Sequence, residues 1–171
     1  MIKLLVIADD FTGAMDTGVQ FKARGTLIQV SSGKDIEFLT KNHSNLQVLI
    51  VDAETRHMSP ENAYQTVYRI VRSAMKAGIS CIYKKTDSGL RGNIGSELTA
   101  ALNASGKKRL HFVPAFPLLN RTTENGVHYI DGKPVAQSVF GKDPFEPVRS
   151  SKVEEIIHSQ SPVHTCLMGS A

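Results

Sequence analysis

The feature that most constrains the fold is a short apolar run that stops at two aspartates and a glycine turn. Residues 4–8 read Leu-Leu-Val-Ile-Ala, and Asp9, Asp10 and Gly13 follow at once. An apolar run without polar alternation is typical of a strand buried on both faces of a parallel sheet. Open α/β folds bind ligands at the carboxyl ends of such strands. We therefore expect the two aspartates at a ligand-binding edge.

Strands and helices alternate over the first two thirds of the chain. The helix over 60–77 is the clearest, with Ser59 as N-cap, Pro60 in its first turn and Gly78 after its end. The alternation predicts an α/β domain, Rossmann-like or flavodoxin-like, with three layers and a mostly parallel sheet. Strands are predicted at 2–8, 27–30, 47–51, 79–83 and 110–113, and helices at 13–24 (with Thr12 as N-cap), 60–77 and 94–104.

Residues 114–149 break this pattern, because they are rich in proline and carry no long periodic run. Within them, 127–130 and 133–135 flank Asp131-Gly132 and predict a β-hairpin. We expect an irregular, hairpin-containing C-terminal segment that serves as a binding loop. A further helix is expected to begin within 151–158, and the stretch 159–171 shows no packing pattern.

Length and composition exclude several classes of protein. The chain has 171 residues, which fits one domain, and its 20 Lys and Arg give a net charge of +4 without forming a stripe. No nucleic-acid partner is therefore expected. Cys81 and Cys166 are too few for a disulfide framework or a metal cage, and Cys81 is expected in the core. Without a signal peptide or a membrane-length apolar run, we expect a cytoplasmic protein with no metal site.

A second polar cluster, Lys84 to Asn93, follows the strand predicted at 79–83. Lys85 and Arg91 can hold an anion, assisted by the dipole of the helix that begins near Asn93. The simpler alternative is a solvated loop with one ion pair, Asp87 to Arg91. That alternative leaves the glycines unexplained, and glycines let the backbone approach a ligand. Other candidates in the cluster are Ser88, Gly89 and Gly92.

Weaker signals come from the remaining strand ends and from the irregular segment. One of the paired acids caps the following helix, which leaves the other without a structural task. Asp52 and Arg56 follow the strand predicted at 47–51, and Arg121 lies in the irregular segment. Placement at strand ends raises Arg56 and Arg121 above ordinary loop residues.

Two other functions fit part of the pattern. A receiver-like signalling domain has paired acids after its first strand and an aspartate where Asp52 stands, but it needs a lysine after the fifth strand. Residues 114–117 read Pro-Ala-Phe-Pro there instead. A non-catalytic small-anion-binding module stays open, since nothing in the pattern identifies a leaving group.

Several segments together resemble the N-terminal domain of the four-carbon acid sugar kinases. The matches occur in family order over residues 4–149, which makes them far more specific than any single motif. Gly89 and Asn120 depart from the family, which often has Thr and Gly there. The matching segments are 8–14 (Ala-Asp-Asp-Phe-Thr-Gly-Ala), 52–56, 85–95, 114–117, 121–123, 128–132, Asp143-Pro144 and Pro147-Val148.

The resemblance implies an ATP-dependent kinase that phosphorylates the terminal hydroxyl of threonate, erythronate or an oxo-tetronate. It implies that residues 1–150 form the substrate-binding domain and that 151–171 begin a linker or a truncated continuation. A C-terminal domain, absent from this chain, would supply most of the site for ATP and Mg²⁺. The chain alone is then expected to be inactive, and a homodimer is possible.

We expect cations to hold the substrate carboxylate or the transferred phosphate, and acids and hydroxyls to bind the sugar hydroxyls. Asp87 is the favoured catalytic base, because a flanking cation would keep it ionised, and Asp10 is the second candidate. The substrate-binding set is Asp9, Asp10, Thr12, Arg56, Lys85, Asp87, Ser88, Arg91, Gly92, Asn93, Arg121 and Thr122.

Overall fold

The computed structural model describes residues 2–41 and 45–168. The first part alternates strand and helix, as predicted. Its elements are β1 (Leu4–Ala8), α1 (Phe11–Lys22), β2 (Ile28–Ser31), α2 (Ile36–Lys41), β3 (Val48–Asp52), α3 (Pro60–Lys76), β4 (Ile82–Lys85) and α4 (Ile94–Ser105).

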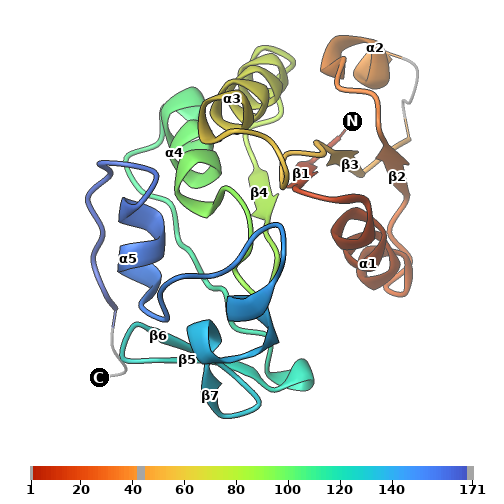
Figure 1. Ribbon diagram of the computed structural model, residues 1–171. Helices are drawn as coiled ribbons and strands as arrows, with labels where there is room; N and C mark the ends of the chain where they lie inside the picture. The colour runs from red at the N-terminus through yellow and green to blue at the C-terminus, as the bar shows by residue number, and fades with distance from the viewer. Residues whose placement is uncertain (1, 42–44, 169–171) are drawn as a thin grey trace.

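The four strands of this part form a parallel sheet in the order β2-β3-β1-β4. Side chains alternate across it, so Leu5 and Ile7 pack toward α2, α3 and α4, whereas Val6 and Ala8 pack toward α1. Figure 1 shows the resulting three layers, with α1 on one face of the sheet and α2, α3 and α4 on the opposite face. The expected three-layer α/β fold is confirmed.

The helix ends follow from capping residues. Ser59 Oγ accepts the Asn62 N–H at 3.3 Å at the start of α3, as predicted. The apolar residues of α3 recur at helical spacing, as a buried face requires, and they lie within the core; they are Ala63, Val67, Ile70, Val71 and Ala74. At α1 the N-cap is Asp10, whose Oδ1 accepts the Gly13 N–H at 2.9 Å. The expectation that Thr12 caps α1 is wrong, because the helix begins at Phe11, two residues before the predicted start. The cap is one of the paired acids, as also expected.

The second part is built around a small antiparallel sheet, β5-β6-β7. The hairpin predicted at Asp131-Gly132 is confirmed, with both residues at positive φ. Asn125-Gly126 makes another such turn, which was not predicted. The elements are η1 (Pro117–Leu119), β5 (Arg121–Glu124), β6 (Val127–Ile130), β7 (Lys133–Pro134), η2 (Val135–Gln137), η3 (Val139–Lys142) and α5 (Val153–His158).

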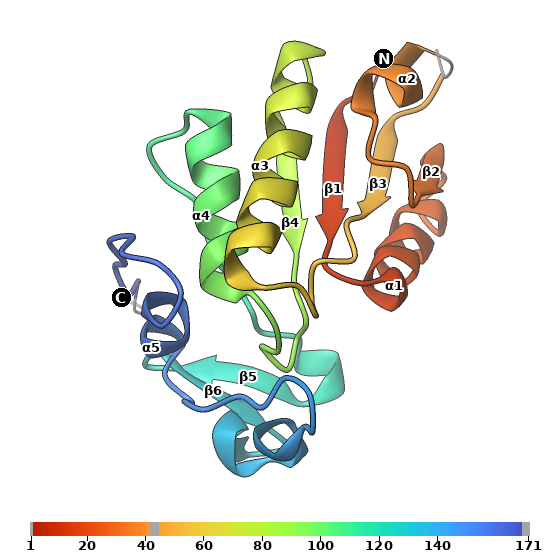
Figure 2. The ribbon, with the colours of Figure 1, turned by 45° about the horizontal axis from the view of Figure 1, so that its top comes forward.

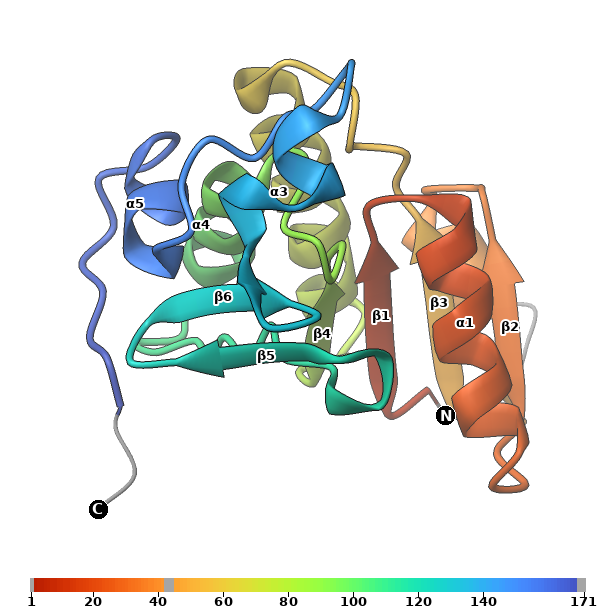
Figure 3. The same cartoon turned by 60° about the horizontal axis from the view of Figure 1, so that its bottom comes forward.

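The small sheet lies beyond the carboxyl ends of the parallel strands, toward which the arrows of β1, β3 and β4 point in Figure 2. A hydrophobic cluster ties it to the first part: Leu90 and Ile94 pack with Ile130, Val148 and Ile157. Gly95 allows α5 close to α4, since a Cβ there would lie 2.2 Å from the Ile157 carbonyl oxygen. The irregular segment is thus an ordered cap over the sheet edge (Figure 3).

The fifth strand predicted at 110–113 is wrong. This segment pairs with no strand in the described part of the chain, so β4 stays at the edge of the sheet. The sequence shows an apolar run but cannot show whether a partner strand lies beside it. Cys81, expected in the core, is exposed, because it precedes β4 on this open edge. The short α2 was not predicted, because its six residues make fewer than two helical turns and cannot show a repeating apolar pattern.

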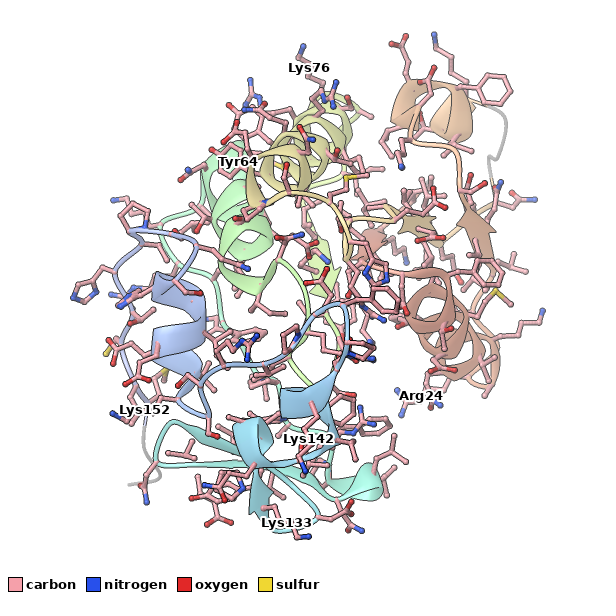
Figure 4. The ribbon with its side chains drawn as sticks, in the orientation of Figure 1. Arg24, Tyr64, Lys76, Lys133, Lys142 and Lys152 are labelled. Carbon is pink, nitrogen blue, oxygen red and sulfur yellow. The ribbon has the colours of Figure 1, made fainter. Side chains whose placement is uncertain are left out.

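The surface carries its basic residues on many elements. Figure 4 shows Arg24, Lys76, Lys133, Lys142 and Lys152 spread around the periphery and directed outward. None of the helices in the described ranges combines the length and the apolar character needed to cross a bilayer.

Candidate functional site

A groove of about 1400 Å³ runs from the carboxyl edge of the sheet along β4. It passes between α1, α4 and residues 107–116. It brings together most of the predicted site residues, which belong to β4, to the first turn of α1 and to the loops after β1, β3 and β4, with one from β5. These are Asp10, Thr12, Arg56, Lys85, Asp87, Ser88, Arg91 and Arg121; Asp9, Gly92, Asn93 and Thr122 do not line it.

Arg56 is held by both acids of the first strand. Its Nε donates to Asp9 Oδ2 at 2.8 Å, and its Nη1 lies 2.6 Å from Asp10 Oδ2. Burial disfavours the charged guanidinium, but the charge and hydrogen bond of Asp9, together with the charges of Asp87 and Asp10, outweigh it, and the pKa of Arg56 lies above its ordinary value. Asp9, the one of the paired aspartates that does not cap α1, thus has a structural role, because it is buried beneath the site and holds Arg56 in place.

Arg91 bridges two carboxylates. Its Nε donates to Asp87 Oδ2 at 2.6 Å, and its Nη1 donates to Asp143 Oδ2 at 3.1 Å. Burial raises the pKa of Asp87, but the hydrogen bond and charge of Arg91 outweigh it, so that pKa is lowered. The N–H groups of Glu146 and Phe145, followed by Arg91, lower the pKa of Asp143 to about 2. Both acids are therefore ionised at neutral pH.

The turn after β4 is tightly folded. Leu90 is buried and has a φ of 61°. Gly92 has a φ of +83°, and a Cβ at this position would crowd Arg56, because it would lie only 3.0 Å from Arg56 Cγ. A left-handed leucine is rare outside sites where surrounding contacts enforce it. The Leu90 N–H donates to the Asp87 carbonyl at 3.0 Å and closes the turn. The turn therefore presents Asp87 and Ser88 to the groove in one fixed arrangement.

Ser88 is anchored from β5 and β6. Its Oγ accepts a hydrogen bond from Arg121 Nη1, and its carbonyl oxygen is 2.9 Å from His128 Nε2. A carbonyl can only accept, so Nε2 carries the proton, and Nδ1, 2.9 Å from Thr123 Oγ1, accepts. Burial lowers the pKa of His128, which is neutral. His128 is fully buried, and it positions the turn.

Asn93 serves the site indirectly. Its Nδ2 donates to the carbonyls of Thr55 and Met58, both at 2.9 Å, and so orders the loop that carries Arg56. The start of α4, where we expect the helix dipole to assist an anion, already has a partner from within the protein. Gln160 Oε1 accepts the Gly95 N–H at 2.9 Å, so this N–H group at the N-terminus of α4 is not free for a ligand. Gln160 belongs to the stretch 159–171, in which the sequence shows no packing pattern.

A buried ion pair lies beneath the groove and was not predicted. Lys84 Nζ is 2.7 Å from Glu97 Oε2, and Lys84 also donates to the Lys85 carbonyl at 2.7 Å. Burial raises the pKa of Glu97, although Lys84 opposes this. The sequence held one sign of this ion pair, because Glu97 is a single acid on the otherwise apolar face of the helix predicted at 94–104. Lys85 itself donates to the Thr86 carbonyl at 2.7 Å.

Other polar candidates lie apart from this constellation. Thr122 and Asn120 border a separate small cavity of about 410 Å³ near Asp131. Asp52, the acceptor position of a receiver domain, is buried and does not line the groove. Within residues 2–41 and 45–168, no group of three or more His, Cys, Asp or Glu side chains could hold a metal ion.

The fold and groove define an α/β ligand-binding domain, with cations and acids converging at the carboxyl edge of a parallel sheet. Residues 4–169 match the family described as the sugar-binding N-terminal domain. The chain belongs to this family, and the resemblance to the four-carbon acid sugar kinases is confirmed.

Named relatives agree with this assignment. D-threonate kinase of Salmonella typhimurium is 37% identical over 163 residues, covering 95% of this chain and 38% of the relative. D-erythronate kinase of Heliobacterium modesticaldum is 32% identical, covering 99% and 40%. A domain of unknown function from Bordetella bronchiseptica, a domain-swapped dimer with bound citrate, superimposes with a TM-score of 0.86 at 34% identity, covering 92% and 40%. The chain thus spans about two fifths of the length of these relatives.

Proposed function

We propose that this chain is the sugar-acid-binding part of an ATP-dependent kinase that phosphorylates the terminal hydroxyl of a four-carbon acid sugar such as threonate, erythronate or an oxo-tetronate. The observation that carries the proposal is the convergence of Arg56, Arg91 and Arg121 with the ionised Asp87 on one groove. A sugar acid needs these two features, because it has a carboxylate at one end and hydroxyls along its length.

The arginines suit the carboxylate end of such a ligand. A guanidinium has five N–H donors in a planar fork. Arg91 directs one donor to Asp87 and one to Asp143, which leaves further donors for a ligand while fixing the plane of the group. The citrate held by the Bordetella relative is itself a hydroxy acid, which supports an acid-binding role.

Asp87 suits the reacting hydroxyl better than Asp10. Both oxygens of Asp10 are engaged, Oδ1 by the Gly13 N–H and Oδ2 by Arg56. Asp87 receives Arg91 on Oδ2, while Oδ1 accepts no hydrogen bond from any residue in the described ranges. In the proposed reaction Oδ1 accepts the proton of the attacking hydroxyl. Phosphoryl transfer depends mainly on such positioning and on charge stabilisation.

The residues described here do not fit a nucleotide and its metal. The start of α4 is occupied by Gln160, and no suitable metal-ligating cluster lies within these residues. We therefore propose that ATP and Mg²⁺ are held by a separate nucleotide-binding domain, such as the additional length of the relatives could provide, and that residues 1–150 act as the substrate domain. The chain alone should then transfer little or no phosphate.

Calorimetric titration with the D- and L-isomers of threonate and erythronate tests the proposal. We expect one isomer to bind saturably, with binding lost in Arg91→Ala and weakened in Arg91→Lys, which keeps the charge but not the fork. Arg72→Ala, on the exposed face of α3, is the matched control. A folded chain that binds none of the acids would contradict the proposal, as would undiminished binding by Arg91→Ala. Robust ATP turnover by the chain alone would contradict the two-part account.

A further inference from the structure

Phe140 of η3 lies beside two of the cations of the groove. Its ring centroid is 5.0 Å from Arg91 Cζ and 5.1 Å from Arg121 Cζ. The two arginines come from distant parts of the chain, one from the turn after β4 and the other from the start of β5. Because both guanidinium groups lie over one ring, the ring links the positions of two charges that repel each other.

The ring is itself firmly placed. The Phe140 carbonyl accepts the Val148 N–H at 3.1 Å, and its N–H donates to Ser138 Oγ at 3.2 Å. The side chain packs against the cluster that joins the small sheet to α4. On the groove side it meets Gly89, where a Cβ would lie 2.6 Å from the ring carbon Cδ1. The absence of a side chain at Gly89 is what lets the ring reach the two arginines.

The two arginines are otherwise anchored to different partners. Arg91 is held by Asp87 and Asp143, and Arg121 donates to Ser88 Oγ. Phe140 contacts both of them and carries no charge of its own. Its aromatic face attracts each guanidinium without using any of the N–H donors. The donors that the acids leave free therefore stay available to a ligand.

We propose that Phe140 is a positioning residue that sets the placement of Arg91 and Arg121 and thereby the preference of the groove among short sugar acids. The effect on ligand preference rests on the proposed function, whereas the placement of the two arginines does not. An aliphatic side chain fills similar space but offers no π face, so Arg91 would be held only by its two carboxylates and Arg121 only by Ser88, without a common contact between them. A tyrosine keeps the face.

Three variants separate this role from a merely structural one. Phe140→Leu removes the π face, and Phe140→Tyr restores it. Phe145→Leu is the matched control, because Phe145 lies on the same segment, is 79% exposed and supports Asp143 only through its backbone N–H. Thermal unfolding identifies the variants that are folded.

The first readout is the NMR signal of each arginine Nε–Hε group, assigned with Arg91→Lys and Arg121→Lys. Protons over an aromatic face are shifted upfield by its ring current. We expect upfield signals for Arg91 and Arg121 in the wild type, Phe140→Tyr and Phe145→Leu. Phe140→Leu loses the ring current together with the ring, so its placement readout is the heteronuclear ¹H–¹⁵N NOE of the two Nε–Hε groups, which we expect to fall below the wild-type value. Undiminished NOE values in folded Phe140→Leu would overturn the proposal. If Phe140→Leu does not fold, absence of the upfield shifts in the wild type and Phe140→Tyr would overturn it.

The second readout is calorimetric affinity for the threonate and erythronate isomers. We expect Phe140→Leu to bind the preferred acid about tenfold more weakly and to discriminate less among isomers, with Phe140→Tyr and Phe145→Leu within about twofold of the wild type. Equal weakening by Phe140→Tyr and Phe140→Leu would overturn the proposal. A wild-type chain that binds no acid would overturn the proposed function and the ligand preference, while the arginine signals would still decide whether Phe140 positions the two side chains.

Discussion

Arg56 Nε donates a 2.8 Å hydrogen bond to Asp9 Oδ2 between residues 47 positions apart in the sequence. The bond joins the end of β1 to the loop after β3, and the parallel pairing of Ala8 with Asp52 brings these two ends together. Both side chains are largely buried, with 11% of Arg56 and 3% of Asp9 exposed. The side of the groove that carries Arg56 therefore rests on an ion pair that is part of the sheet edge.

Asp9→Asn is expected to destabilise the fold more than Asp10→Asn. Asp9→Asn leaves the buried Arg56 guanidinium with only the more exposed Asp10 as its ionic partner, and the free energy of unfolding should fall by about 3 kcal/mol. Asp10→Asn keeps an N-cap for α1 and removes a more exposed charge, so the loss should be about 1 kcal/mol or less. Urea denaturation measures both. Equal losses in the two variants would show that Asp9 is not the principal anchor of Arg56.

The pair formed by Lys84 and Glu97 offers a double-mutant test. Lys84→Met alone or Glu97→Leu alone should lower the free energy of unfolding by about 3 to 5 kcal/mol, because each leaves a buried charge unpaired. The double variant should recover much of this loss, since an apolar pair of similar volume avoids the desolvation of both ions. Additive losses in chemical denaturation would show that the two charges do not act as a pair.

Because His128 is buried, we expect the free energy of unfolding to depend on pH near neutrality. Its pKa is lowered from 6.5 in the folded chain, chiefly by burial, so the unfolded chain binds this proton more readily. The free energy of unfolding should therefore decrease as the pH falls through 6.5. Replacing His128 with Gln should flatten this decrease between about pH 8 and about pH 5, whereas His164→Gln, on an exposed residue, should not. Denaturation at several pH values measures the slope, and an unchanged slope in His128→Gln would refute the assignment.

The open edge of β4 predicts self-association of the chain, and we propose a homodimer through this edge. Tyr83 on β4 is 45% exposed, and an unpaired strand edge is a template for another strand. Tyr83→Lys should lower the associated fraction in sedimentation velocity over a concentration series. Leu118→Lys, at an 89% exposed position on η1, should have little effect. A monomeric wild type at every concentration would count against the dimer.

Much of the groove was predictable because consecutive strands of a parallel sheet deliver their ends to one edge. Asp10, Arg56, Asp87 and Arg91 each follow a predicted strand closely, and each lines the groove. Phe140 was not predictable in this way. Its local sequence does not distinguish it from an ordinary aromatic residue in a loop. Its contacts with the two arginines form only when η3 folds back over the turn at Gly89.

The sequence by itself determined the alternation of strands and helices, the face of α3 that is buried and the collection of charged residues at the sheet edge. These depend on local periodicity, capping and chain direction. Only the tertiary structure decided that residues 110–113 find no partner strand among the residues it describes, that Gln160 occupies the start of α4 and that Lys84 pairs with Glu97. Each of these depends on contacts between segments far apart in the chain. A local sequence pattern does not indicate which distant residue will contact a given segment.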